Sequence, residues 1–170
     1  VAGLGSITGG DVDGFQAAGI FNHASGSVDG FQWSGLFNIA GGDVSIMQNS
    51  GLMNITGGSF TGFQSAGLFN VTGSSVAGFQ AAGIFNIGSS LVGGQAAGIF
   101  NATGIAEGAQ IAGCVNVSAA SSGAQIGGLL NMTGAMEGVQ LGLVNIAGAA
   151  RGARAIARAS RDRMKGPRLA

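Results

Sequence analysis

The sequence predicts an all-β fold, a single-chain β-solenoid of about nine coils of 15–16 residues with a short C-terminal α-helix. The first observation behind this prediction is a glutamine that is followed, nine times along the chain, by a short apolar stretch and an asparagine. The second is the composition: 46% of the residues are hydrophobic and only one is proline, so the 35 glycines do not indicate a collagen-like or disordered chain. The third is a change of pattern near residue 148, which divides the chain into a repeat domain at 1–148 and a basic tail at 149–170.

The length of the repeat selects the architecture. The spacing is 16 residues over the first five units and then 15, with one further residue lost inside the last unit. Helical repeats need about 33 residues and leucine-rich repeats at least about 20, so this unit is too short for either. It suffices for one coil of a β-solenoid, and nine coils stacked ~4.8 Å apart would form a rod roughly 43 Å long. The repeated amides are Gln16, Gln32, Gln48, Gln64, Gln80, Gln95, Gln110, Gln125 and Gln140, with Asn22, Asn38, Asn54, Asn70, Asn86, Asn101, Asn116, Asn131 and Asn145.

Comparison of the units separates the inside of the coil from the outside. The residue after each glutamine varies from Ala17 to Trp33 to Ile111, which is typical of a surface. Because strand side chains alternate between faces, the glutamine then points inward, and so does the asparagine. Buried amides avoid a desolvation cost when each one hydrogen-bonds to the amides of the neighbouring coils. We therefore expect two internal amide ladders.

Two more columns are expected in the interior. The position two residues after each glutamine always holds a small residue. The position two residues before each asparagine always holds an apolar residue of similar volume. The second set should form the core, which makes Cys114 a buried small hydrophobe. It comprises Ile20, Leu36, Leu52, Leu68, Ile84, Ile99, Cys114, Leu129 and Leu143. Two glycine columns, three residues after and two residues before the glutamine, are expected to mark a bend and a turn or bulge.

The same alternation places large hydrophobic side chains outside. Nine of the ten phenylalanines fall in two columns that are expected to form an interface, together with Trp33. An exposed apolar stripe of this length is expected to be covered by a partner. The alternative is that the inward and outward faces are exchanged and the phenylalanines form the core. The two columns contain Phe15, Phe31, Phe63 and Phe79, and Phe21, Phe37, Phe69, Phe85 and Phe100, with Met47 and Met53 in the remaining early positions.

Charge is distributed unevenly along the chain. All seven basic residues lie in the last 20 positions, whereas residues 1–150 contain six acidic residues and no Lys or Arg. From Ala149 to Met164 the arginines recur at steps of three and four, which predicts an amphipathic helix ended by Gly166-Pro167. Its expected roles are a cap on the end of the solenoid, a contact with the acidic early coils of a neighbour, or binding of nucleic acid or anionic lipid. The residues expected to make these contacts are Arg151, Arg154, Arg158 and Arg161.

The sequence offers no set of residues for catalysis. His23 is the only histidine and is expected to be a solvated turn residue, so no nucleophile can be paired with a base. Asp13 and Asp29 would stack ~5 Å apart, but the period does not match the calcium-binding nonapeptide repeat. We expect no cofactor, no metal and no enzymatic activity. The five Asn-x-Ser/Thr sequons coincide with ladder positions, so glycosylation is not expected.

Nothing in the sequence predicts a membrane span or a signal peptide. No apolar run approaches the roughly 18 residues of a spanning helix. The chain opens in the middle of a unit, because Gly3–Thr8 aligns with Gly51–Thr56. It is therefore expected to be a processed or truncated segment, and the missing leader does not argue against export.

The repeat resembles a known group of proteins. Units such as Gly62-Phe63-Gln64-Ser65-Ala66-Gly67-Leu68-Phe69-Asn70 are similar to the G-[FLV]-Q-x-x-G-[LIV]-x-N repeats of bacterial surface-repeat proteins, over roughly residues 3–148. This resemblance implies an exported or cell-surface protein without a catalytic role. A weaker similarity, the Gln-x-Gly-x-x-Asn pattern, connects the chain to the curli fibre subunit, whose unit is longer and ends in a glutamine that is missing here.

These observations favour a structural role. The leading hypothesis is a self-associating subunit of a bacterial extracellular fibre or surface layer. Its partner would be another copy of the chain, bound laterally through the Phe columns and head to tail through the basic tail. The alternative is an adhesin or a module that binds a membrane surface through the same columns. Nucleic-acid binding is not favoured, and ice binding is disfavoured because no regular Thr-x-Thr array is present.

Overall fold

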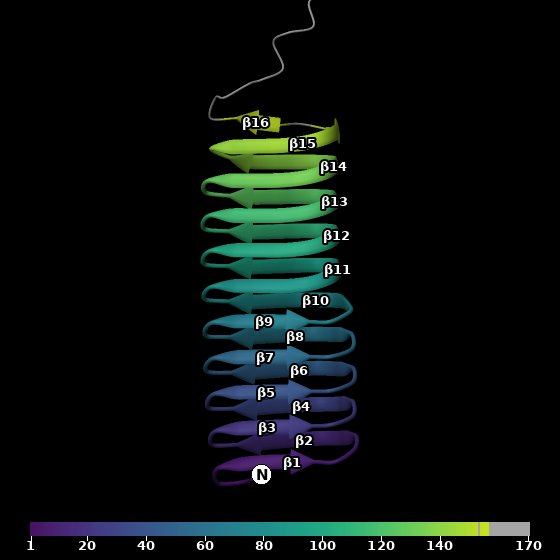
Figure 1. The fold of residues 1–170 in the computed structure, drawn as a ribbon, viewed down its shortest axis with the longest axis vertical. Helices are drawn as coiled ribbons and strands as arrows, with labels where there is room; N and C mark the ends of the chain where they lie inside the picture. The colour runs from purple at the N-terminus through teal and green to yellow at the C-terminus, as the bar shows by residue number, and fades with distance from the viewer. Residues whose placement is uncertain (153, 157–170) are drawn as a thin grey trace, which may run out of the picture.

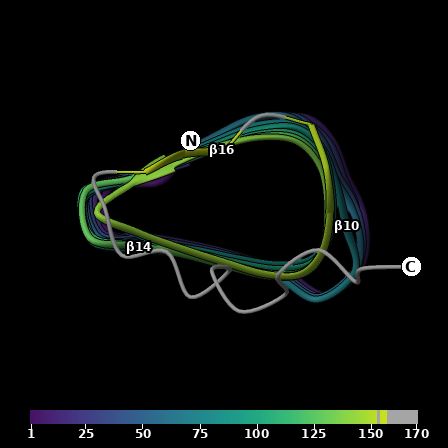
Figure 2. The same cartoon turned by 90° about the horizontal axis from the view of Figure 1, so that it is seen from above.

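The protein forms a straight rod of stacked coils (Figure 1). The computed structural model describes residues 1–152 and 154–156, the last three by their backbone alone. Over this range the chain makes about ten turns of an all-β solenoid. Viewed along the rod, successive turns superpose on one closed outline (Figure 2). The predicted all-β solenoid is therefore confirmed, with about one turn more than the nine expected.

Sixteen strands build the rod. They are β1 (Gly5–Thr8), β2 (Val12–Ala18), β3 (Phe21–Ala24), β4 (Val28–Ser34), β5 (Phe37–Ala40), β6 (Val44–Ser50), β7 (Met53–Thr56), β8 (Phe60–Ala66), β9 (Phe69–Thr72), β10 (Ser75–Ala82), β11 (Phe85–Ala97), β12 (Phe100–Ala112), β13 (Val115–Gly127), β14 (Leu130–Gly142), β15 (Val144–Arg151) and β16 (Arg154–Ile156).

Every strand pairs in parallel with the equivalent strand of the next coil. Odd-numbered strands from β1 to β9 stack on one side of the rod and even-numbered strands from β2 to β10 on the other, and both series meet in β11. Identical residues face each other across the pairs, for example Gln32 with Gln48 and Asn38 with Asn54. Because the register follows the repeat, each amide lies directly above its counterpart in the previous coil.

The shortening of the repeat changes the shape of the coil. The residue lost after the fifth unit falls between the asparagine and the next glutamine. In the 16-residue coils this segment contains a break, as at Ser25–Gly26 between β3 and β4. In the 15-residue coils it continues as strand, so that β11 to β14 each contain 13 residues and cover both sides of the rod.

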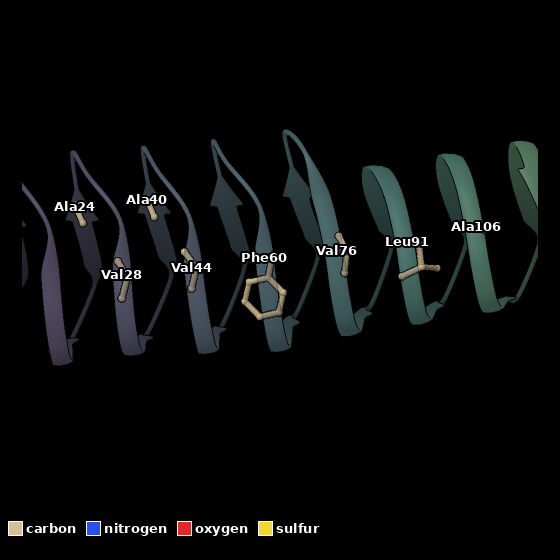
Figure 3. Close-up of a cluster of buried hydrophobic side chains, with 8 residues drawn as sticks. All are labelled: Ala24, Val28, Ala40, Val44, Phe60, Val76, Leu91 and Ala106. Atoms are coloured by element: carbon tan, nitrogen blue, oxygen red, sulfur yellow. The ribbon is translucent and has the colours of Figure 1, made fainter.

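The hydrophobic core is a narrow column along the axis (Figure 3). It contains Val28, Val44, Phe60, Val76, Leu91 and Ala106, flanked by Ala24 and Ala40, all with 1% exposure or less. The larger members lie four residues before each glutamine, so strand alternation turns them to the same side as the glutamine. Phe60, the one phenylalanine outside the two predicted columns, belongs here. This column was not predicted from the sequence.

The prediction that the aliphatic column two residues before each asparagine forms the core is wrong. Seven of its nine members are 37–53% exposed, and Ile84 and Cys114 are half-buried. These residues occupy the tight bend between the glutamine strand and the asparagine strand, where the alternation of the first strand no longer applies. The exposed members are Ile20, Leu36, Leu52, Leu68, Ile99, Leu129 and Leu143.

The bend itself depends on the glycine that precedes this column. A Cβ atom on Gly35 would lie 2.1 Å from the carbonyl oxygen of Gly19 in the neighbouring coil, too close for any side chain. The glycine column before the glutamine has another cause, since Gly30 has a φ of 145° and its counterparts also have positive φ values. Ile46 holds this conformation with a φ of 84°, which is unfavourable for a β-branched residue. The first glycine column therefore lies at the predicted bend, whereas the second lies within the glutamine strands, at residues such as Gly30 in β4, where the chain needs a positive φ.

The predicted C-terminal helix is also wrong over the residues that the structure describes. Ala149–Arg151 belong to β15, which pairs with β14, and Arg154–Ile156 form β16. The edge of the preceding coil offers a row of backbone donors and acceptors to the incoming chain, and this pairing outweighs the helical propensity of an Ala/Arg sequence. The remainder of the predicted helix, with Arg158 and Arg161, lies outside the described residues. No helix of the described part is long and apolar enough to cross a membrane.

Candidate interaction surface

The glutamine ladder runs through the interior of the rod. All nine glutamines are at most 4% exposed, and eight of them donate from Nε2 to Oε1 of the glutamine in the preceding coil. The Nε2–Oε1 distances lie between 2.5 and 3.2 Å, for example 2.6 Å from Gln64 to Gln48. Threonine hydroxyls that point inward from the asparagine strand add a second contact, such as Gln80 Nε2 to Thr72 Oγ1 at 3.0 Å. The ladder thereby joins the two sides of each coil.

The asparagine ladder runs beside it in the opposite direction. Each asparagine from Asn22 to Asn131 donates from Nδ2 to Oδ1 of the asparagine in the following coil, over 2.7–3.0 Å. Its other Nδ2 hydrogen reaches the backbone oxygen of the residue after the glutamine in that following coil, as from Asn70 to Ala81 at 2.7 Å. That carbonyl lies next to the bend, and the short amide of asparagine meets both acceptors at once. This geometry explains why no other residue occupies the column.

The two ladders end with unpaired acceptors. Oδ1 of Asn22 at the N-terminal end and Oε1 of Gln140 at the C-terminal end are buried without a hydrogen-bond partner. In register with them lie Ser6 and Arg154, which stand where the repeat would place an asparagine and a glutamine. The ladders therefore stop where the sequence pattern stops. They position the outer surface but do not themselves offer a reactive group.

The outward side chains of the glutamine strands form what we call the glutamine-side face. Phe15, Phe31, Phe63 and Phe79 are 39–56% exposed, and Trp33 is 55% exposed. The Phe63 and Phe79 rings stack with centroids 6.0 Å apart, whereas Phe15 and Phe31 are tilted by 48°. The aromatic column ends after Phe79, where Gly94 and Ala109 take its register positions.

Acidic residues interrupt the glutamine-side face. Four exposed acidic residues point outward from the position two residues before the Phe15 column, which continues through Ala109 and Val139 in the later coils. They are Asp13, Asp29, Glu107 and Glu137. Asp11 and Asp43 occupy the turn before this strand, where each carboxylate accepts a 2.7 Å hydrogen bond from a backbone N–H of the next coil. Within the described residues no three His, Cys, Asp or Glu side chains come together as metal ligands.

The asparagine strands carry a different surface, which we call the asparagine-side face. Two outward columns flank the asparagines, and 17 of their 18 residues are apolar; His23 in the first coil is the exception. One column is Phe21, Phe37, Met53, Phe69, Phe85, Phe100, Val115, Leu130 and Val144. The other is His23, Ile39, Ile55, Val71, Ile87, Ala102, Val117, Met132 and Ile146. This column was not predicted from the sequence, although it has the same parity as the phenylalanines.

Stacking gives this face an even surface. The Phe69, Phe85 and Phe100 rings stack with centroids 4.8 and 4.9 Å apart, and Phe21 stacks on Phe37 at 5.4 Å. Because each ring covers its neighbours, the five phenylalanines are half-buried. The exposed bend residues, such as Leu36 and Leu52, continue the apolar surface along one side. The structure thus places every predicted interface residue outside, but on two chemically different faces.

The remaining candidate positions hold no catalytic arrangement among the described residues. His23 lies in β3 rather than in a turn, and its Nε2 is 3.4 Å from Ser25 Oγ. A shallow pocket of about 300 Å³ lies beside the last coils, where the core column narrows to Ala106 and Ser121. Glu107 and Glu137 line it two coils apart, about 10 Å along the rod. This separation keeps the two carboxylates apart, and Arg151, which also lines the pocket, lies in register with Glu137.

Comparisons with models of known protein families, with curated proteins and with solved structures find no match for this chain.

Proposed function

We propose that this chain is a non-catalytic structural protein, a β-solenoid subunit that associates with copies of itself in a bacterial extracellular fibre or surface layer. The asparagine-side face is the observation that carries this proposal: it is apolar from the second coil to the last, and His23 in the first coil is its one ionisable residue. A surface of this extent is unfavourable in water and is typical of an interaction site.

The interior supports a mechanical role. Two hydrogen-bonded ladders and continuous parallel pairing connect each coil to its neighbours along the rod. Stability in such a repeat architecture is the sum of the coils and of the contacts between them, so it grows with length. A protein of this type resists bending and presents the same surface at every coil. Extracellular location rests on the resemblance of the repeat to surface-repeat proteins.

Electron microscopy and light scattering of the purified chain test this proposal. We expect particles larger than one chain, whose mass rises with concentration. A chain that remains strictly monomeric at high concentration would overturn the proposal.

The second candidate is an adhesin or membrane-binding module that uses the exposed phenylalanines of the glutamine-side face. The exposure of Phe15 and Phe63, 56% and 42%, favours it. Replacing Phe15, Phe31, Phe63 and Phe79 by Ser should then abolish binding to neutral or anionic lipid vesicles, measured by co-sedimentation, and leave self-association unchanged. Loss of self-association in this variant would instead favour assembly through the glutamine-side face.

A further inference from the structure

We propose that the asparagine-side face binds the same face of a second copy of this chain, with the two rods antiparallel and related by a two-fold axis near Ile87. This inference rests on the proposed self-association and specifies its first step, a lateral dimer. It also separates the two phenylalanine columns, since only the one that contains Phe85 lies in the contact.

The size of the face fits a second copy. Nine coils give a length of about 43 Å, and the five residues from the bend to the end of the asparagine strand give a width of about 16 Å. The resulting area of about 700 Å² approaches the roughly 800 Å² that each partner buries in a standard protein interface. Two such faces can pack like the sheets of a β-sandwich, about 10 Å apart.

The chemistry of the rod selects this face over the other. All six acidic residues of positions 1–150 lie on the glutamine strands or in the turn before them. A dimer through the glutamine-side face would bring Asp13, Asp29, Glu107 and Glu137 close to the contact and to each other. A dimer through the asparagine-side face buries no charge and leaves these carboxylates in water, as is favourable for interface cores.

The size gradient along the face selects the antiparallel arrangement. Its first column is Phe or Met in the first six coils and then Val115, Leu130 and Val144. Antiparallel rods place Phe37 opposite Leu130 and Met53 opposite Val115, so large residues meet small ones and the gap stays even. Parallel rods related by a two-fold axis along their length would place the first column opposite the second, with Phe37 opposite Ile39 and Val144 opposite Ile146, so the bulkier pairs would gather at one end and the gap would be uneven.

Charge favours the same orientation. Asp11, Asp13, Asp29 and Asp43 lie in the first three coils, and all seven basic residues of the sequence follow position 150. An antiparallel dimer brings these acidic coils of each copy to the end of the other at which Arg151 lies. A parallel dimer would instead bring the aspartates of the two first ends together, which is costly. Two-fold dimers are also the commonest symmetric assemblies.

Sedimentation equilibrium of the full chain tests which face is used. Ile87→Glu would place two carboxylates against each other at the axis and should weaken dimerisation at least about 100-fold. The matched control is Ala77→Glu, which adds the same charge in the same part of the rod, at an exposed position of the acidic column on the glutamine-side face, and should leave dimerisation unchanged. Equal effects of both variants, or assembly that persists in Ile87→Glu while the control disrupts it, would overturn the choice of face. A wild-type chain that is monomeric would overturn the proposed function as well.

Thiol-specific cross-linking with a bismaleimide of about 10 Å span tests the orientation without relying on the folding of the charged variant, because facing Cα atoms about 10 Å apart are too distant for a disulfide. In a Cys114→Ser background, Phe37→Cys and Leu130→Cys chains should each stay uncross-linked alone and form a cross-linked dimer when mixed. Ile87→Cys should cross-link to itself. Cross-linking of Phe37→Cys to Ile39→Cys, with none to Leu130→Cys, would show parallel rods, and the absence of a cross-link from every combination would exclude the face-to-face contact.

Discussion

Removal of one rung from the asparagine ladder should destabilise the rod far more than removal of the same side chain from its surface. Asn70 is fully buried and takes part in three hydrogen bonds: from Asn54 at 2.9 Å, to Asn86 at 2.8 Å and to the backbone oxygen of Ala81 at 2.7 Å. Asn70→Ala leaves a donor and two acceptors without partners at a fully buried position.

The magnitude follows from these three contacts. A buried polar group that loses its partner costs about 1–3 kcal/mol, so three groups with partial relaxation should lower the free energy of unfolding by about 3–6 kcal/mol. This is a large part of the ~5–15 kcal/mol that stabilises an ordinary domain. The control is Asn49→Ala: Asn49 points outward from β6, and its replacement should cost less than about 1 kcal/mol.

Urea denaturation followed by circular dichroism measures both variants. Because a solenoid can lose coils locally, amide hydrogen exchange of β7, β9 and β11 should show whether protection falls first around the missing rung. The reasoning would be refuted if the two variants differed by less than about 1 kcal/mol, since the ladder would then contribute no more than an exposed amide.

Three further substitutions test other parts of the fold by thermal and urea unfolding. Ser34→Ala should raise the free energy of unfolding by about 1 kcal/mol, because the Ser34 hydroxyl is buried without a partner, and a loss of stability would indicate a bound water. Gly35→Ala should lower the free energy of unfolding by more than about 2 kcal/mol, because its Cβ would clash with the carbonyl oxygen of the neighbouring coil. Its control is Gly9→Ala, which has no atom near its Cβ and should change the free energy of unfolding by less than about 0.5 kcal/mol. Similar effects of the two substitutions would contradict the bend geometry. Ile46→Gly should add about 1 kcal/mol by relieving the positive φ, unless the exposed Ile46 side chain makes a contact in an assembly.

The sequence predicts the parts of this fold that the repeat itself defines. Strict recurrence of glutamine and asparagine sets both the register and the inward side, and one variable column next to Gln32 identifies the outward side. The core column could not be recognised in the same way, since it ranges from Phe60 to Ala106 and Ser121 and looks like a variable surface. Uniform size was also misleading at the bend, where Leu36 and its counterparts are constrained by their neighbours above and below without being buried.

The C-terminal error has a different physical origin. Local spacing of arginine and alanine from Ala149 onward resembles a helix when each segment is considered alone. In the structure, β14 presents its edge to the following residues, and the pairing continues beyond Asn145, the last ladder residue, with Glu137 aligned with Arg151 and Gln140 with Arg154. Pairing of the incoming chain with the edge of the preceding coil depends on the tertiary structure, and the local spacing of residues in the sequence does not reveal it.

The opposite directions of the two ladders have an electrostatic consequence. Side-chain amides are dipoles, and one row of nine aligned amides would accumulate a field along the rod, as peptide dipoles do in an α-helix. Here the glutamine row and the asparagine row point in opposite directions, and the backbone of a β-sheet contributes only a small net dipole. Further coils therefore add hydrogen bonds without separating charge between the two ends, so the rod can lengthen without an electrostatic penalty.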